Sequence, residues 1–314
     1  GFLYTLTGVN SSGKTFVALR MAADVARGAK FGQYKTTQGA VLYLAGENHT
    51  DVQSRWAALC AKLGIDPETV PLHFVPGRFD LKEHMAAVLE RIEVLGNVRL
   101  VIVDTAQAFY TGDEENNNQQ QIDFATTLRK MSTPSKRPAV VVLAHPKKGT
   151  DPRAFPIEPR GGSGLLNEID GNWNLIKVSR DPMLTEMRCT DKHRGREFDT
   201  IPFRLDLVWG PFKDADGNDM SSRVAIPLDD EGEVAVVREV AADDQALLVM
   251  MRDHDGKSLQ AWADNLGEPW SKSKVQRKVE KFAKERDNAP ALTIKGTDGS
   301  WHLTAAGHAK VGAS

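Results

Sequence analysis

Apolar and polar positions alternate in blocks over the first 150 residues of the chain. Short, continuous apolar runs are typical of buried strands. They lie at residues 3–7, 39–46, 98–104 and 139–144, with a shorter candidate at 72–75. Apolar residues at helical spacing predict helices directly after residue 15 and at 50–63, 81–95 and 121–131. Strands that alternate with helices predict an α/β fold, in which a mostly parallel sheet is covered on both faces.

The pattern changes in the second half of the chain. Four alternating segments are typical of antiparallel strands, at residues 171–178, 183–190, 201–208 and 224–227. The last 70 residues predict helices at 244–252, 258–266 and 271–286 and a hairpin with strands at 292–294 and 301–303. Three helices followed by a hairpin indicate a small winged-helix domain. We therefore expect an α/β core over residues 1–228, an acidic linker over 229–243 and a winged helix over 244–314.

A glycine-rich segment with the spacing G-x-x-x-x-G-K-T follows the first predicted strand and opens the first predicted helix. This spacing is that of a phosphate-binding loop. Its residues and the next one are Gly8, Val9, Asn10, Ser11, Ser12, Gly13, Lys14, Thr15 and Phe16. The glycines let backbone N–H groups turn toward phosphate oxygens, Lys14 supplies a cation, and the Thr15 hydroxyl can ligate Mg²⁺. The flanking strand and helix argue against a chance match, so we predict a site for ATP and Mg²⁺.

Chemically active side chains follow the predicted strands. Glu47, Asp104 and His145 each stand at or just beyond the end of a strand, as Lys14 follows the first one. Ligands of parallel sheets bind beyond the carboxyl ends of the strands, so these four side chains should converge. Each has a plainer alternative: Glu47 as a solvated loop acid, Asp104 as a strand-end cap, and His145 as a turn residue before a proline.

Charge and composition exclude several other classes of protein. The chain has 314 residues and a formal net charge of −2, so any contact with nucleic acid must come from a local basic patch. Two distant cysteines fit a reducing, cytoplasmic environment without a zinc site. No apolar run reaches the length of a membrane span. The chain starts without Met just before its first strand, and we expect a segment to precede it.

The third C-terminal helix is the local basic patch. Residues 271–286 hold seven basic and two acidic side chains around an apolar stripe. We expect four of the basic residues to lie off that stripe and to contact DNA: Lys274, Arg277, Lys278 and Lys281. The alternatives are a solvated helix face or a protein-docking surface.

The order of these motifs resembles the RecA-like core of hexameric helicases. Two segments look like the RepA-type replicative ATPases of plasmids and phages: Asp104-Thr-Ala-Gln-Ala-Phe with Gly112-Asp-Glu-Glu-Asn, and Arg160-Gly-Gly-Ser163 before a helix. Lys192-His-Arg194-Gly is similar to the lysine-x-arginine pair of DnaB-type helicases. The resemblance covers roughly residues 1–210 and rests on the combination of motifs.

The resemblance implies a role for each residue. Glu47 is the implied general base, Asp104 holds Mg²⁺ through its water shell, and His145 senses the γ-phosphate. Lys192 and Arg194 reach the site of a neighbouring subunit as cations acting in trans. Arg160, Arg180, Arg188 and Arg196 compete with Arg194 for that role. A single histidine in Ala144-His145-Pro146, where RepA-type chains often carry a pair, departs from the pattern.

We therefore expect an ATP-hydrolysing DNA motor. The resemblance implies a cytoplasmic, hexameric helicase that acts on single-stranded or forked DNA in the replication of a phage or mobile element. One alternative is an ATP-dependent DNA-binding or recombination accessory protein that does not separate strands. Another is a nucleotide-dependent transcriptional or assembly switch.

Overall fold

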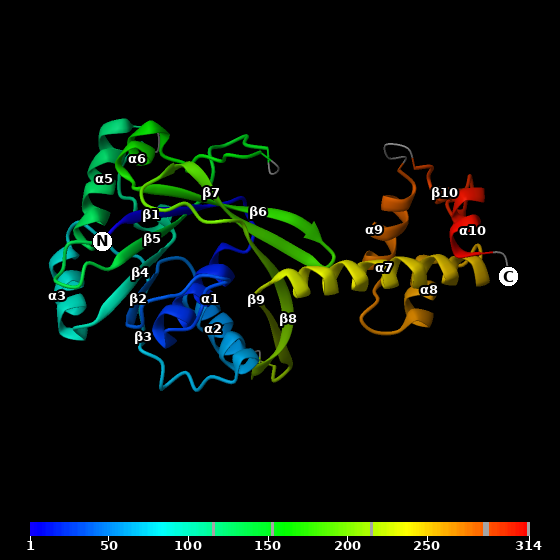
Figure 1. The fold of residues 1–314 in the computed structure, drawn as a ribbon, viewed down its shortest axis with the longest axis horizontal. Coiled ribbons are helices and arrows are strands. Elements are labelled where there is room, and N and C mark those ends of the chain that lie inside the picture. Colours follow the sequence, from blue (N-terminus) through cyan, green and yellow to red (C-terminus); the bar gives the residue numbers. More distant parts are fainter. Residues whose placement is uncertain (115–116, 152–153, 214–215, 285–288, 313–314) are drawn as a thin grey trace. The chain divides into compact units, whose positions relative to one another are not determined.

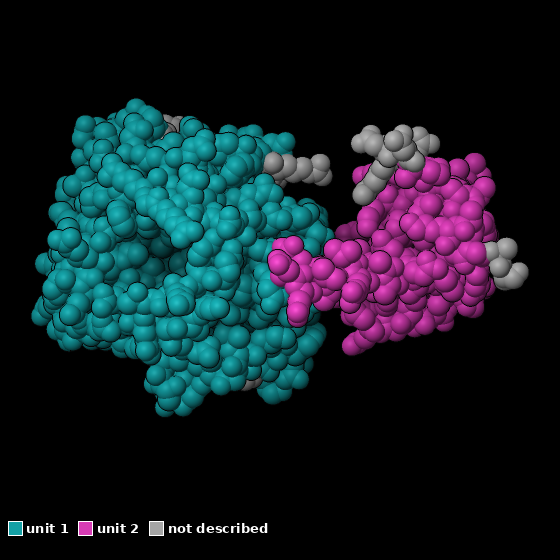
Figure 2. Space-filling model, in the orientation of Figure 1, with its two compact units in different colours: residues 1–229 teal, residues 230–314 magenta. Residues whose placement is uncertain are grey.

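The chain divides into two compact units, residues 1–229 and residues 230–314 (Figure 2). The computed structural model describes residues 1–114, 117–151, 154–213, 216–284 and 289–312. Parts of four predicted segments lie outside these ranges: the loops at 112–121 and 149–159, the turn at 214–218, and the end of the helix at 271–286. None of the helices in the described ranges is both long and apolar enough to cross a membrane.

A single nine-stranded sheet organises the first unit. Its strands lie in the order β3 (Leu72–Pro76), β2 (Ala40–Ala45), β4 (Val98–Asp104), β5 (Ala139–Ala144), β1 (Leu3–Thr7), β6 (Gly171–Arg180), β7 (Met183–His193), β8 (Ile201–Lys213) and β9 (Asp219–Pro227). Neighbours from β3 to β6 pair in parallel, and those from β6 to β9 pair antiparallel. The prediction of an α/β fold with a mostly parallel sheet is confirmed.

Helices cover both faces of this sheet (Figure 1). One face packs on α1 (Lys14–Arg27) and α2 (His49–Leu63), and the antiparallel strands add Phe203 and Leu205 to the same core. The other face packs on α3 (Met85–Leu95), α4 (Ala106–Phe109), α5 (Asn118–Lys130) and α6 (Gly162–Glu168). The central strands are buried on both sides, which explains why they read as continuous apolar runs rather than alternating ones.

Several element boundaries differ from the predicted ones. α5 begins at Asn118, three residues before the predicted start, because the Asn117 side chain caps it by accepting from the Gln120 N–H. α3 begins at Met85 rather than at residue 81. β8 and β9 extend into a longer hairpin than their alternating segments indicated.

The second unit contains the predicted helices and hairpin in the predicted order. They are α7 (Asp230–Asp253), α8 (Leu259–Leu266), α9 (Lys272–Phe282), β10 (Thr293–Lys295) and β11 (Trp301–Leu303), followed by α10 (Ala305–Val311). Trp262, Leu247 and Val279 lie at the centre of its separate core. Residues 230–243, predicted as part of a linker, form the N-terminal part of α7. The short helix α10, capped by Thr304, was not predicted.

Two of the four basic residues expected to contact DNA lie in the interior of the second unit. Lys274 forms an ion pair with Asp243 at 2.7 Å, and Lys278 pairs with Asp244 at 2.5 Å. Both lysines are buried, and Lys274 also lies 4.4 Å above the Trp270 ring. The prediction that they lie off the buried face is wrong, because the acidic pair on α7 compensates lysines that flank the apolar stripe.

The third and fourth basic residues differ in exposure. Lys281 is half-buried and reaches Asp244 at 3.2 Å, whereas Arg277 is exposed. The acidic residues of α7 therefore neutralise much of the basic face of α9.

Replacing Lys278 by alanine is expected to destabilise the packing of α7 on α9. The change removes the shorter ion pair of Asp244, a partly buried residue, and leaves its longer pair with Lys281. The free energy of unfolding of the second unit should fall by about 1–3 kcal/mol. Amide hydrogen exchange in α7 and α9 of the full chain measures this loss locally. Lys272→Ala, at an exposed position of the same helix, is the matched control. Equal protection in the Lys278→Ala and wild-type proteins would contradict the internal role of the lysine.

Candidate active site

The turn between β1 and α1 can be built only with glycine at two positions. Gly13 has a φ of +99°, and a Cβ there would lie 2.7 Å from a methyl group of Leu205. A Cβ on Gly8 would lie 2.6 Å from the Ser12 hydroxyl oxygen. Side chains at either position would strain the backbone or fill the loop, so both glycines keep its interior open for a ligand.

Lys14 lies across this loop. Its Nζ donates to the Gly8 carbonyl oxygen at 2.7 Å and to the Val9 carbonyl oxygen at 3.1 Å. An ammonium group has three donors, so one remains for a ligand. Burial lowers the pKa of Lys14 to about 8, although the nearby Asp104 and Glu47 carboxylates favour its charged form.

Two hydroxyl groups donate hydrogen bonds to Asp104 at the end of β4. Thr15 Oγ1 donates to Asp104 Oδ2 at 3.0 Å, and the Tyr43 hydroxyl donates to the same oxygen at 2.7 Å. Burial raises the pKa of Asp104 in spite of these hydrogen bonds. The predicted pair of magnesium ligands, Thr15 and Asp104, is thus brought together. Tyr43 was missed, because a tyrosine within an apolar run indicates only a strand.

Glu47 stands beyond the end of β2 and is exposed. The buried Thr105 donates from its hydroxyl to Glu47 Oε1 at 2.8 Å. This bond orients one carboxylate oxygen and leaves the other for a water molecule. Thr105 follows directly after Asp104, and this adjacency is the sequence signal that could have identified it.

His145 lies at the same edge of the sheet. Its pKa is lowered by burial first and by the charge of Lys14 second, while Glu47 acts in the opposite direction. The imidazole is therefore neutral at neutral pH. It lies close enough to Lys14 and Glu47 for their charges to affect its pKa. Arg160 is also close, because its backbone N–H donates to the His145 carbonyl oxygen at 2.7 Å.

Arg55 is a third residue that the sequence analysis missed. It lies on α2, pairs with Asp51 at 2.6 Å, and stacks over the Phe16 ring at 4.6 Å. Its charge also favours the ionised form of Asp104. An arginine in an amphipathic helix gives no signal of its own, and only the fold places it beside the phosphate-binding loop.

Lys192 and Arg194 lie at the opposite edge of the sheet. β7 runs antiparallel to β6, and His193 pairs with Gly171, which itself pairs with Tyr4 near the start of β1. The phosphate-binding loop follows the other end of β1, about 13 Å away at 3.3 Å per residue. Lys192 donates to the Asn167 carbonyl oxygen at 3.2 Å, and Arg194 pairs with Asp170 at 3.2 Å. Neither residue reaches the site of its own chain.

The residues at the site fit a nucleoside triphosphate with Mg²⁺. The Ser12 hydroxyl is buried and has no hydrogen-bond partner within the described part of the chain, so it is available to a phosphate oxygen. The first N–H groups of α1 and the remaining donor of Lys14 face the same loop. The oxygen atoms of Thr15 and Asp104 are the donors that Mg²⁺ prefers.

Nucleotide affinity is expected to fall as the pH rises above about 8, because Lys14 then loses its positive charge. Bound phosphate favours the charged lysine, so the affinity should be constant below about pH 8 and then fall by up to about tenfold per pH unit. Titration calorimetry at neutral and alkaline pH measures this dependence. The Lys14→Arg protein, which stays charged, should lack the alkaline decrease. A similar decrease in both proteins would contradict the assignment to Lys14.

Comparison with known proteins agrees with this geometry for the first half of the chain. A search of the curated proteins found no match. Residues 1–151, which hold the phosphate-binding loop, Glu47, Asp104 and His145, match the family model described as an AAA domain. Over this part the chain is similar to AAA domains, which agrees with the ATPase site that the geometry indicates.

Proposed function

We propose that the chain is an ATP-hydrolysing DNA motor, a RepA-like hexameric helicase of the replicative type. The observation that carries the proposal is the division of the charged residues between two sheet edges. Lys14, Asp104 and Glu47 meet at one edge, while the exposed cation Arg194 lies at the other. Arg194 of one copy supplies the missing cation when the end of the sheet that carries it faces the phosphate-binding loop of the next copy.

The chemistry follows from the positions of the side chains. Thr15 and Asp104 hold Mg²⁺, which supplies charge neutralisation at the phosphates. Lys14 binds phosphate oxygens, and Glu47, oriented by Thr105, accepts a proton from the attacking water. His145, neutral and close to Lys14, can donate or accept a hydrogen bond at the terminal phosphate. One chain thus supplies every group that nucleotide hydrolysis needs except the cation that acts in trans.

Arg194 and Lys192 are proposed as the trans-acting cations. Charge spreads onto the terminal phosphoryl oxygens in the transition state, and a water-excluded cation stabilises it there. Arg194 has 70% of its side chain exposed, so it is available to a neighbouring copy. Among its competitors, Arg160 lies beside His145 in its own chain, which makes it a poorer candidate for a role in trans.

The second unit is proposed to act as a winged helix that holds DNA. The support is its order of three helices and a hairpin, together with exposed cations on α9. Because Lys274 and Lys278 are buried against α7, the exposed Arg277 is a stronger phosphate-contacting candidate than the half-buried Lys281. The exposed Lys272, at the start of the same helix, joins them in this revised proposal.

Strand displacement on a forked duplex tests the proposed function. Wild-type protein with ATP and Mg²⁺ should separate the strands and should hydrolyse ATP faster when single-stranded DNA is present. The Glu47→Gln protein is the matched control that should bind the fork without opening it. DNA-stimulated hydrolysis without displacement would replace the helicase by an accessory protein, and hydrolysis insensitive to DNA would favour a nucleotide-dependent switch.

A further inference from the structure

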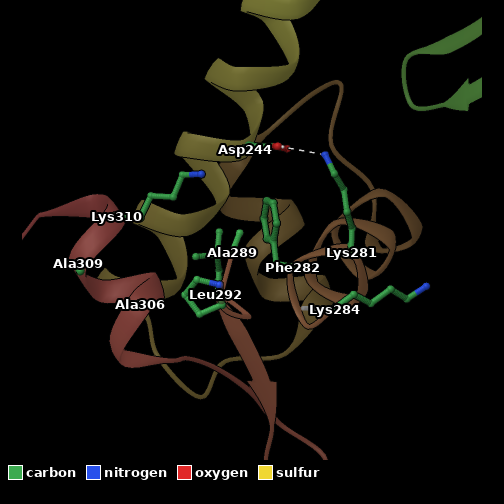
Figure 3. A pocket seen from close by; sticks show the side chains of 10 residues that line it. Asp244, Lys281, Phe282, Lys284, Ala289, Leu292, Ala306, Ala309 and Lys310 are labelled. Carbon is green, nitrogen blue, oxygen red and sulfur yellow. Dashed lines mark hydrogen bonds and ion pairs between the residues drawn. The ribbon is translucent and has the colours of Figure 1, made fainter. Parts of the chain in front are cut away.

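The second unit contains a cavity of about 650 Å³ between α7, α9 and α10. Phe282, Leu292, and Ala306 and Ala309 of α10 are among its apolar lining residues (Figure 3). Apolar side chains of this kind offer no hydrogen-bonding groups to a nucleotide base. The cavity suits apolar side chains inserted from a protein segment.

Lysines surround this apolar surface. Lys284 and Lys310 are exposed, and they lie on opposite sides of the Phe282 ring in Figure 3. Lys281 also lines the cavity, but it is paired with Asp244, the acidic residue of the lining. Among the described residues that line the cavity, three lysines outnumber one aspartate, and this positive charge favours a segment that combines acidic and apolar residues.

The first half of α7 has this complementary composition. Its first turn carries the exposed acids Asp230, Glu231 and Glu233. Val234 and Val237 follow at helical spacing and are 48% and 69% exposed. Residues three apart share a helix face, so the two valines form an apolar stripe beside the acidic turn.

This segment cannot reach the cavity of its own chain. α7 is continuous from Asp230 to Asp253, and Asp244 in its second half lines the cavity. Val237 therefore lies about 10 Å along the helix axis from that position, at 1.5 Å per residue. Because a continuous helix cannot fold back on itself, only another chain can bring the acidic stripe to the basic cavity.

We propose that the cavity of one copy receives the Asp230–Val237 segment of α7 from a second copy. The two surfaces differ, so the contact is heterologous, and repeated contacts of this type close into a ring or continue as a filament. The proposal rests on the ring that the proposed function requires and adds the surfaces that hold its second units together. It is independent of the Arg194 contact, which involves only the first unit.

Cysteine pairing tests the contact directly. Val237→Cys protein mixed with Ala309→Cys protein, both carrying Cys189→Ser, should form a disulfide-linked heterodimer under mild oxidation. The remaining native cysteine, Cys60, is buried. Val94→Cys, at a 70% exposed position of α3, replaces Val237→Cys in the control mixture and should give little product. Equal cross-linking in the two mixtures would overturn the proposal.

Charge reversal provides a second test in the full chain. Lys284→Glu with Lys310→Glu should raise the protein concentration for half-maximal assembly by about tenfold, because acids would then face acids. Adding Glu231→Lys and Glu233→Lys should restore much of the assembly. Lys257→Glu with Lys295→Glu, at exposed lysines of the second unit outside the cavity, is the matched control.

The outcomes of sedimentation with ATP and of DNA-binding titrations separate the possible failures. Assembly of the Lys284→Glu, Lys310→Glu protein at the wild-type concentration would overturn this contact while leaving the ring intact. The same result with a loss of DNA affinity would assign the rim to DNA instead. A wild-type protein that stays monomeric at every concentration would remove the proposed ring as well.

Discussion

The Glu47→Gln protein is expected to bind ATP with wild-type affinity and to hydrolyse it about 10²–10⁴-fold more slowly. The amide keeps the size of the side chain and can still accept the hydrogen bond from Thr105, whose donor lies 2.8 Å from Glu47 Oε1. It cannot accept a proton from the attacking water. The loss should therefore appear in turnover and not in binding.

Lys14→Ala is the contrasting variant. It removes the cation that lies across the phosphate-binding loop, so nucleotide binding itself should be lost. Fluorescent-nucleotide titration and phosphate release, measured on the same preparations, distinguish the two kinds of defect. Wild-type turnover in the Glu47→Gln protein would exclude Glu47 as the general base.

The Arg194→Ala protein is expected to bind ATP normally and to hydrolyse it about 10³–10⁵-fold more slowly, as expected for the loss of a trans-acting arginine. Its fold should persist, because Asp170 still accepts from the Leu3 N–H at 2.8 Å and from Arg129 at 2.9 Å. Lys130→Ala is a control that removes an exposed cation from α5, and it should leave turnover near the wild-type value.

Mixing the Arg194→Ala and Glu47→Gln proteins tests the shared site further. Each should hydrolyse ATP slowly on its own, but some interfaces of the proposed mixed ring would combine an intact Glu47 with an intact Arg194. Phosphate release should therefore recover in part. A mixture that exchanges subunits, as shown by fluorescence transfer between labelled chains, and still shows no recovery would count against action in trans.

Much of the first unit could be predicted because its signals are local. Buried parallel strands read as apolar runs, and the phosphate-binding loop fixes its residues at defined spacing. The topology rule for parallel sheets then predicts that Lys14, Glu47, Asp104 and His145 lie at one edge. These residues meet in the structure because each follows a parallel strand.

Residues that act through long-range contacts could not be predicted in this way. Tyr43 and Thr105 reach the site through hydrogen bonds between neighbouring strands, at 2.7 Å and 2.8 Å. Lys274 and Lys278 appeared to be free cations because their partners, Asp243 and Asp244, lie on another helix. The sequence shows which charges exist, but only the packing of α7 against α9 decides which of them face solvent.

Phosphate release per chain, measured against protein concentration in ATP and Mg²⁺, tests the central claim most directly. The claim is that Lys14, Asp104 and Glu47 form an ATPase site that a neighbouring chain completes. The rate per chain should be low in dilute protein and should rise together with the assembled mass, reaching a higher plateau when single-stranded DNA is added. A rate per chain that is the same for monomer and assembly, or no hydrolysis at any concentration, would contradict the claim.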